Sequence, residues 1–289
     1  MLTLFTDTDT DITPKVAKEY GYKLISMPYS YDGKTIYPYE DFEEFDAHAF
    51  YDMLRAGVLP TTSALGEDKY IAYFEPEFAA GNDIFYVHFS RAMTATFDAM
   101  DKAVAALKEK YPERKFYELD TKGITIGSYN IVREVGDLFL AGKTPEEVLE
   151  WGKTEVDKFG IYFFADDLKF FRRSGRVSGL AATMGGLIGI RPIIYMSSEG
   201  KMVSIGKAKG RQNAINTLVD YVLTLGEDVL QHRLVIAQTD AMPLAQQVGA
   251  ILREKFGEGL RIEYVDVNPT AGSHCGPNAV GVSFHAKHR

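Results

Sequence analysis

The chain of 289 residues is poor in the features that mark secreted and membrane proteins. It has one cysteine, so no internal disulfide can form, which favours a reducing compartment. No stretch approaches the roughly 18 consecutive apolar residues that a membrane-spanning helix needs. The first residues reach aspartates at once and lack the cationic and apolar segments of a signal peptide. We therefore expect a cytoplasmic protein with no membrane span.

Positive charge is also scarce. The chain carries 32 Lys and Arg against 40 Asp and Glu, a net charge of −8, so no basic field would attract phosphates and we expect no nucleic-acid partner. No P-loop or dinucleotide fingerprint occurs, because Gly185-Gly186 does not follow a strand in the required way. What is present is an apolar fraction of 46% and a length sufficient for one large domain or two ordinary ones.

The first half of the chain alternates apolar runs with segments of helical spacing. Strands are predicted at 2–6, 21–31, 83–90 and 114–120, and helices after Pro14, from Phe97 to Leu107, at 126–140 and at 145–159. The run 83–90 is apolar throughout, as expected for a strand that is buried on both faces. This alternation predicts an N-terminal α/β domain with a parallel sheet and helices on both faces.

The pattern of predicted elements changes near residue 160, where we place an approximate domain boundary between residues 1–160 and 161–289. A strand and a short helix are predicted within 161–179, two antiparallel strands about a Glu-Gly turn within 190–210, a helix at 211–225, and strands at 232–239, 260–267 and 279–286. The second domain is thus expected to be α/β as well, with a mixed or antiparallel sheet.

Alternating aspartates follow the first strand. Asp7, Asp9 and Asp11 suggest a calcium loop, but Ile12 stands where that loop needs glycine. Asp9, Asp11 and Thr13 match the Asp-x-Asp-x-Thr pattern of aspartyl phosphatases of the haloacid dehalogenase superfamily, in which magnesium assists the first carboxylate as nucleophile. The alternative is a polar turn in which Asp or Thr caps the following helix.

Two later segments are rich in hydroxyl groups. Residues 61–63 read Thr-Thr-Ser, and Ser90, Thr94 and Thr96 lie between the strand 83–90 and the next helix. Ligands of parallel sheets bind beyond the carboxyl ends of strands, where helix N-termini offer free N–H groups. Such hydroxyls would suit a carboxylate, or they would simply cap the helices, and the residues alone leave both interpretations open.

Basic and sulfur-containing residues offer weaker evidence. Arg172, Arg173 and Arg176 form either a solvated face or a phosphate contact. His274 and Cys275 are neighbours, so in an extended segment they would point to opposite sides and would not form a catalytic dyad. Further ligands for zinc are not spaced usefully. We therefore expect no metal site here, and His274 is interpreted as a polar lining group or a core histidine.

Taken together, these segments resemble the DegV family of bacterial fatty-acid-binding proteins over nearly the whole length. The segments that carry the resemblance are "FTDTDTDI", "TTS" at 61–63, "HFSRAMTATFDAM", "DDLKFFRRSGRVS", "MGGLIGIRPII" with a following "EGK", and "AGSHCGPNAVGVSF". The resemblance implies two α/β domains with a lipid tunnel between them, which the apolar run 179–190 would help to line.

The resemblance also implies a set of ligand-binding residues. The carboxylate of the fatty acid would meet Thr62, with Thr94 in place of a serine of the family motif, and Ser63, Ser90 and His274 would lie nearby. Arginines would contact the head group, its phosphate or a kinase, and these are Arg173, Arg176 and Arg211. No cofactor and no metal is implied.

Some family members are the acyl-carrying subunit of a bacterial fatty acid kinase, in which a separate ATP-using protein phosphorylates the carboxylate. The expected ligand is therefore a long-chain fatty acid such as palmitate, and the expected role is that of a carrier rather than an enzyme. A lipid transporter or sensor without a kinase is the alternative. Transient contact with a membrane surface is compatible with either role.

Overall fold

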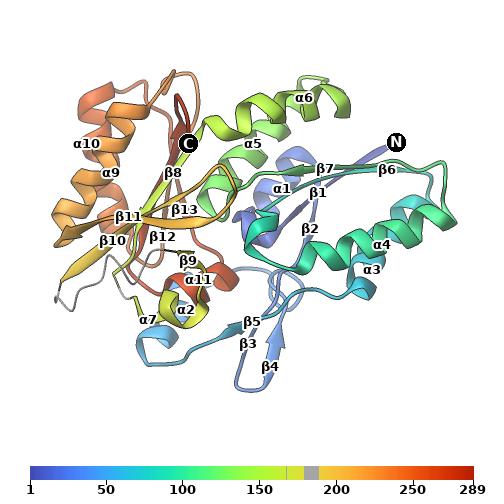
Figure 1. The fold of residues 1–289 in the computed structure, drawn as a ribbon, viewed down its shortest axis with the longest axis horizontal. Helices are drawn as coiled ribbons and strands as arrows, with labels where there is room; N and C mark the ends of the chain where they lie inside the picture. The colour runs from blue at the N-terminus through green and yellow to red at the C-terminus, as the bar shows by residue number, and fades with distance from the viewer. Residues whose placement is uncertain (167, 179–188) are drawn as a thin grey trace.

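The computed structural model describes residues 1–166, 168–178 and 189–289 (Figure 1). Its first sheet is parallel throughout, as the alternating sequence predicts. In spatial order its strands are β2 (Tyr22–Ile25), β1 (Leu2–Asp7), β6 (Asp83–His88) and β7 (Phe116–Asp120). The carboxyl ends of β1 and β6 therefore open at the same edge, which is where ligands of parallel sheets bind.

Helices cover both faces of this sheet. In Figure 1, α5 (Ile126–Leu140) and α6 (Pro145–Glu155) lie above it and α3 (Glu67–Ala79) and α4 (Thr96–Lys110) below it, and α1 (Pro14–Tyr20) packs beside α5. Local sequence explains the ends of α1, because Pro14 occupies its first turn and the Thr13 side chain accepts the Val16 N–H. The helical face of α4 predicted from Phe97 to Leu107 is buried.

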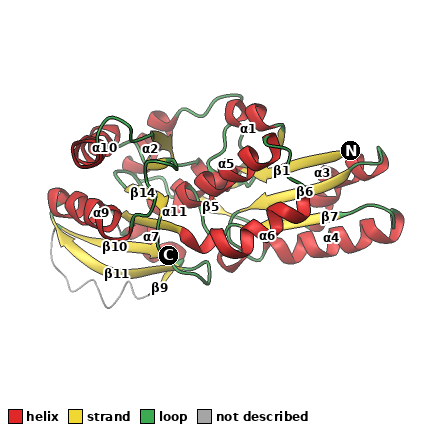
Figure 2. Ribbon diagram, turned by 90° about the horizontal axis from the view of Figure 1, so that it is seen from above, coloured by secondary structure: helices red, strands yellow, loops and turns green. Residues whose placement is uncertain are grey.

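The second sheet is mixed, with parallel and antiparallel pairs. In spatial order its strands are β13 (Ile262–Asp266), β12 (Leu234–Gln238), β14 (Val280–His285), β8 (Phe159–Phe164), β10 (Ile190–Met196), β11 (Met202–Lys209) and β9 (Val177–Ser178). One face carries α9 (Arg211–Leu225) and α10 (Met242–Phe256), which enclose a separate apolar core. Figure 2 shows these two helices at the end of the molecule remote from the first sheet.

Some elements differ from their predicted bounds. The run 21–31 forms two strands, β2 and β3 (Tyr29–Tyr31), interrupted at Pro28, which has no N–H for a sheet. With β4 (Lys34–Ile36) and β5 (Thr61–Thr62), β3 builds a small third sheet. The helix predicted at 145–159 ends at Glu155, because strand β8 begins at Phe159.

Other short helices complete the fold. They are α2 (Ala47–Arg55), α7 (Lys169–Ser174) and α11 (Pro269–Cys275), and of these only α7 was expected from the sequence. Within the described ranges, no helix is both long and apolar enough to cross a bilayer. The pair Gly185-Gly186 and most of the run 179–190, which we expected to line a tunnel, lie outside the described residues.

Helix α5 joins the two large sheets. It contacts strands of the first sheet on one side and β8, β12 and β14 on the other. Two of its glycines face opposite neighbours: any side chain at Gly127 would overlap Ile161 of β8, and any at Gly136 would overlap the ring of Tyr20. Because α5 belongs to both packing arrangements, it fixes the separation of the sheets. The domain boundary near 160 stays a prediction.

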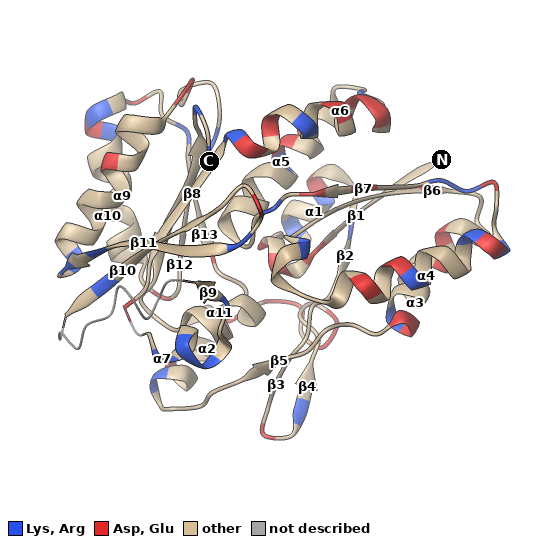
Figure 3. Cartoon of the chain, in the orientation of Figure 1, with Lys and Arg blue, Asp and Glu red and all other residues tan. Residues whose placement is uncertain are grey.

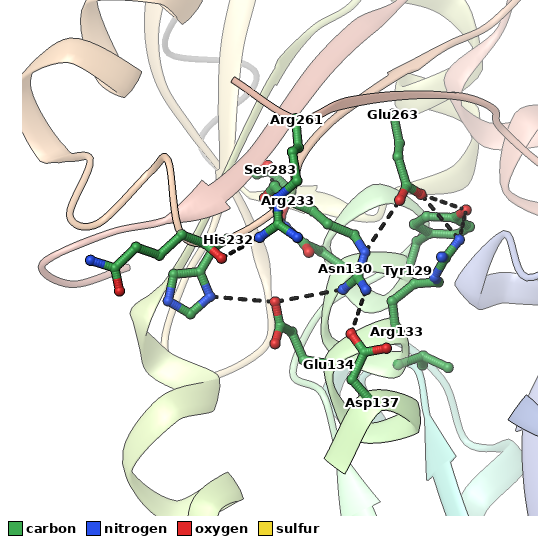
Figure 4. Close-up of polar contacts among 12 residues, drawn as sticks. Tyr129, Asn130, Arg133, Glu134, Asp137, His232, Arg233, Arg261, Glu263 and Ser283 are labelled. Carbon is green, nitrogen blue, oxygen red and sulfur yellow. Dashed lines mark hydrogen bonds and ion pairs between the residues drawn. The ribbon is translucent and has the colours of Figure 1, made fainter. Parts of the chain in front are cut away.

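Charged side chains reinforce the contact between α5 and the second sheet (Figure 4). Arg233, with a side chain only 12% exposed, donates to Asp137, and its Nε lies 3.2 Å from Glu263 Oε1 and its Nη1 3.6 Å from Glu134 Oε1. Asn130 Nδ2 donates to Ser283 Oγ over 3.3 Å. Removal of the guanidinium would leave three carboxylates facing one another.

We therefore expect Arg233→Met to lower the free energy of unfolding by about 2–3 kcal/mol, because three carboxylates would lose the positive charge that they share at a partly buried contact, although Arg133 would still pair with Glu263. The matched control is Lys153→Met, since Lys153 pairs with Glu150 at the surface, with side chains 70% and 71% exposed. That change should have an effect below about 1 kcal/mol. Urea unfolding monitored by circular dichroism measures both, and equal effects would contradict a structural role for the Arg233 network.

Candidate functional site

A cavity of about 230 Å³ lies between the two large sheets. Its walls are mostly apolar and come from strands of the second sheet, from α5 and α11, and from the segments that follow the strands of the first sheet. Representative wall residues are Ile126, Ile161, Phe163, Met196, Met202 and Val280. The position agrees with the general rule, because the loops after β1 and β6 contribute Asp9 and Phe89 to the wall.

One region of the wall is polar and close to solvent, and we call it the polar mouth: Thr62, Ser63, Thr94, Arg176 and His274. Thr62 Oγ1 lies 2.9 Å from His274 Nε2. Thr62 is in β5, which pairs with β3, and His274 is in the last turn of α11. Ser63 and Arg176 are exposed, so the polar mouth is accessible from outside.

His274 is neutral at physiological pH. Burial, together with the smaller effect of the positive charges of Arg176 and Arg173, lowers the pKa of its imidazole to about 4. Its Nδ1 atom is buried and has no hydrogen-bond partner among the residues that the structure describes. The extended backbone expected around His274 is wrong, because Asn268 caps α11 and Pro269 starts it, so His274 and Cys275 lie on a helix.

The two hydroxyl segments meet at the polar mouth. The Leu65 N–H donates to Thr96 Oγ1 over 3.0 Å, which holds the loop after β5 against the start of α4. Thr94 Oγ1 accepts the Thr96 N–H over 3.1 Å, so the hydrogen of the Thr94 hydroxyl is left to donate to a ligand. Thr94 thus combines a capping contact with a place in the cavity wall.

Three predicted site residues do not line the cavity. The Ser90 hydroxyl donates to the carbonyl of Gly200 over 2.8 Å. Arg211 pairs with Asp166, with Nη2 2.6 Å from Oδ2. Arg173 donates to the carbonyl oxygens of residues 59 and 60, so it positions the chain leading to Thr62. In Figure 3 the basic residues of α7 are blue beside α11, which α7 contacts.

The aspartates after β1 are buried, which favours their protonated forms. Burial is the main cause that raises the pKa of Asp7 to about 7 and that of Asp11 to about 8, and burial with the charges of Asp7 and Asp11 raises the pKa of Asp9 well above its usual value. Asp11 Oδ1 accepts both the backbone and side-chain N–H groups of Asn268. An aspartyl nucleophile must be ionised, so this arrangement does not support the phosphatase hypothesis.

Two other chemical hypotheses, a cysteine nucleophile and a metal site, can be compared with the structure. Burial raises the pKa of the Cys275 thiol to about 12, so it is not a thiolate nucleophile at neutral pH. Within the described ranges, the metal-ligating side chains that cluster are His48, Asp52 and Asp240. They do not line the cavity, and Arg55 donates to both carboxylates.

The fold and the cavity define a two-sheet α/β protein with an apolar interior site, and sequence comparison identifies its family. The chain belongs to the DegV family, because the family model described as "Uncharacterised protein, DegV family" matches residues 1–287. A DegV domain-containing protein of Clostridium perfringens is 28% identical over 282 residues, which cover 97% of this chain and 96% of the relative.

Solved structures share the fold at low sequence identity. A DegV family protein of Eubacterium eligens, loaded with heptadecanoic acid, superposes with a TM-score of 0.84 at 20% identity, covering 99% of this chain and 100% of the other. The Fatty Acid Kinase (Fak) B3 protein of Streptococcus pneumoniae, loaded with linoleic acid, has a TM-score of 0.84 at 19% identity and the same coverage.

Sequence reasoning missed part of the cavity wall. Asp9, Thr125 and Thr239 all line it, although each is buried. The sequence places Asp9 in a calcium-loop pattern, a phosphatase pattern or a polar turn and not in a cavity wall, and the available signal is its position just beyond the strand β1. Thr125 and Thr239 follow the β7 and β12 strands along the chain, but nothing in their neighbours distinguishes them from ordinary loop residues.

The buried Asp11 predicts a pH effect on stability. Its pKa is about 8 in the folded chain against an ordinary value of 3.8, so its stabilising contribution is full below 3.8 and is lost as pH rises through 8. Asp11→Asn removes this titration and keeps the acceptor for Asn268. It also suits the left-handed backbone at this position, where φ is 60°.

We expect Asp11→Asn to raise the melting temperature at pH 8 and to flatten its dependence on pH between 5 and 8. Asp32→Asn is the control, because Asp32 has φ of 50° but is exposed. Differential scanning calorimetry at several pH values provides the measurement. A melting temperature that falls equally at every pH would show that the carboxyl itself is required for packing.

Proposed function

We propose that this protein binds one long-chain fatty acid, with the tail in the cavity and the carboxylate at the polar mouth. The observation that carries the proposal is the Thr62–His274 pair at an accessible end of an otherwise apolar cavity. Support comes from the related folds loaded with heptadecanoic and linoleic acids. The role of the polar-mouth residues in holding a carboxylate is part of the proposal.

The hydrocarbon tail would supply most of the affinity. Burial of a methylene contributes about 0.8 kcal/mol, so roughly 14 methylenes contribute on the order of 11 kcal/mol before the costs of ordering. Hydrogen bonds to a charged carboxylate add about 1.5–3 kcal/mol each. The tail therefore determines whether a ligand stays bound, and the hydroxyl groups determine which way it points.

The neutral imidazole determines where the hydrogen of the Thr62 hydroxyl points. If His274 carries its hydrogen on Nε2, this N–H donates to Thr62 Oγ1, and the hydrogen of the Thr62 hydroxyl is directed away from the ring. A carboxylate would accept that hydrogen and a second one from Thr94. Arg176, which lines the same region, would add the favourable field of a positive charge without requiring a charged histidine.

We further propose that the protein is a carrier that presents the carboxylate to a separate fatty acid kinase in the cytoplasm, rather than an enzyme with a cofactor of its own. The accessible polar mouth would let a partner reach the carboxylate while the tail stays buried. The fold shared with the Fak B3 protein favours this role over storage or sensing without a kinase.

The double variant Thr62→Val/Thr94→Val tests whether the tail determines that the ligand stays bound and the hydroxyl groups determine its orientation. We expect it to retain an acyl chain, because apolar burial is unchanged, but to bind fatty acid roughly tenfold to a hundredfold more weakly and to lose phosphorylation by a fatty acid kinase with ATP. Native mass spectrometry measures bound lipid, and acyl phosphate formation measures presentation.

The control for that variant is Thr61→Val, because Thr61 neighbours Thr62 in β5 but is exposed and outside the cavity wall. It should bind and present fatty acid as the unaltered protein does. Absence of any acyl chain from the unaltered protein would refute the proposed function. Full phosphorylation of the double variant would refute the assignment of the two threonines.

A further inference from the structure

One polar side chain in the cavity wall is not used by the proposed carboxylate site. Asp9 lies in the short helical turn η1 (Thr8–Thr10) directly after β1, and only 6% of the residue is exposed. Its Oδ1 atom is buried without a hydrogen-bond partner, and no hydrogen bond within the described part of the chain involves its carboxyl group. Yet the residue lines the cavity.

The neighbouring carboxyls of Asp7 and Asp11 differ from that of Asp9, because they accept hydrogen bonds. Asp7 Oδ2 accepts the Tyr86 hydroxyl over 3.1 Å and the Phe89 N–H over 3.2 Å. Asp11 is held by Asn268 over 2.7 and 2.9 Å. Neither of these two aspartates lines the cavity. Within the described part of the chain, Asp7 and Asp11 each have one partnered and one unpartnered carboxyl oxygen, whereas the Asp9 carboxyl has no partner and is the one that meets the cavity.

Threonine hydroxyls lie in the same wall as Asp9. The Thr125 N–H donates to the Asp9 carbonyl over 2.8 Å, but the Thr125 hydroxyl makes no hydrogen bond within the described ranges. Thr239 Oγ1 accepts the Ala279 N–H over 2.7 Å, and its hydroxyl hydrogen is unused. Thr270 is different, because its hydroxyl donates to the Met27 carbonyl over 2.6 Å. Unused hydrogen-bonding capacity thus accompanies Asp9.

A buried polar group without a partner destabilises the folded state, so a ligand that supplies the partner gains affinity. Burial and the neighbouring acids raise the pKa of Asp9, which favours the neutral carboxyl, and a neutral carboxyl can both donate and accept. A hydroxyl group has the same two abilities. A second carboxylate would face Asp7 and Asp11 as well, and a saturated tail would leave Asp9 unpaired.

We propose that the cavity is suited to a fatty acid that carries a hydroxyl group along its chain, with Asp9 as the hydrogen-bonding partner of that hydroxyl. The inference rests on the proposed function and specifies the class of acyl chain. Asp9 is then a specificity-determining residue inside the cavity, distinct from the threonines that hold the carboxylate.

The test compares stearic acid with positional isomers of hydroxystearic acid on delipidated protein by competition binding. We expect the unaltered protein to bind at least one isomer about tenfold more tightly than stearic acid, since one recovered hydrogen bond gives a ratio of that order. Asp9→Leu should abolish this ratio and bind stearic acid more tightly. Asp9→Asn, which keeps a donor and an acceptor, should preserve the preference.

The possible binding results distinguish the inference about Asp9 from the proposed function. Equal affinities for stearic acid and every hydroxy isomer in the unaltered protein would overturn the inference, with Asp9 then served by a water, and would leave the proposed function standing. A preference that survives in Asp9→Leu would overturn it too. Failure of the unaltered protein to bind any of these acids would overturn the proposed function itself. Thermal unfolding of each variant establishes that it is folded.

Discussion

The packing of one helix against two sheets determines most of what this molecule can do. Helix α5 contacts β6 of the parallel sheet on one side and β8, β12 and β14 on the other, and its glycines allow close contact with Ile161 of β8 and with Tyr20 of α1. Since a helix lies between the two sheets, space remains beyond the carboxyl ends of β1 and β6, and it is lined by the second sheet, by α5 and α11, and by the segments after the strands of the first sheet. The cavity is a consequence of this spacing.

Electrostatics divides that cavity into an outer and an inner part. Arg176 and the neutral His274 lie at the polar mouth, where an ionised carboxylate would meet donors and a positive charge. Asp9 is the one of the three aspartates after β1 that lines the cavity, and burial raises its pKa, so this part of the wall favours a neutral polar group over a charge. An amphipathic acid therefore has one favourable orientation, with its charge outward and its tail inward.

The sequence predicts the helices and strands whose formation depends on the pattern of neighbouring residues in the chain. The helical spacing of 126–140 gave the bounds of α5 as the structure has them, and the alternation of strands and helices gave the parallel sheet. Thr62, Thr94 and His274 were identified through a family resemblance, and the structure brings them into one cavity wall. No periodicity in the chain would have connected Thr62 with His274, which are 212 residues apart.

The remaining features depend on contacts between distant segments. The Ser90 hydroxyl donates to the carbonyl of Gly200, and Arg211 pairs with Asp166. Neither contact can be predicted from the residues next to it in the sequence. Thr62 is placed by the pairing of two very short strands, β3 and β5, which sequence patterns do not reveal. Helix α11 is short for an α-helix, with seven residues, and its apolar and small residues are equally compatible with an extended approach to β14.

The most direct test of the central claim is a crystal structure of the protein purified with its natural ligand. The account predicts continuous electron density for an acyl chain that runs from Thr62 into the space between the two sheets, with a carboxylate within hydrogen-bonding distance of Thr62 and Thr94. Density that places the carboxylate among the inner aspartates, or a cavity filled by side chains with no ligand in it, would contradict the account.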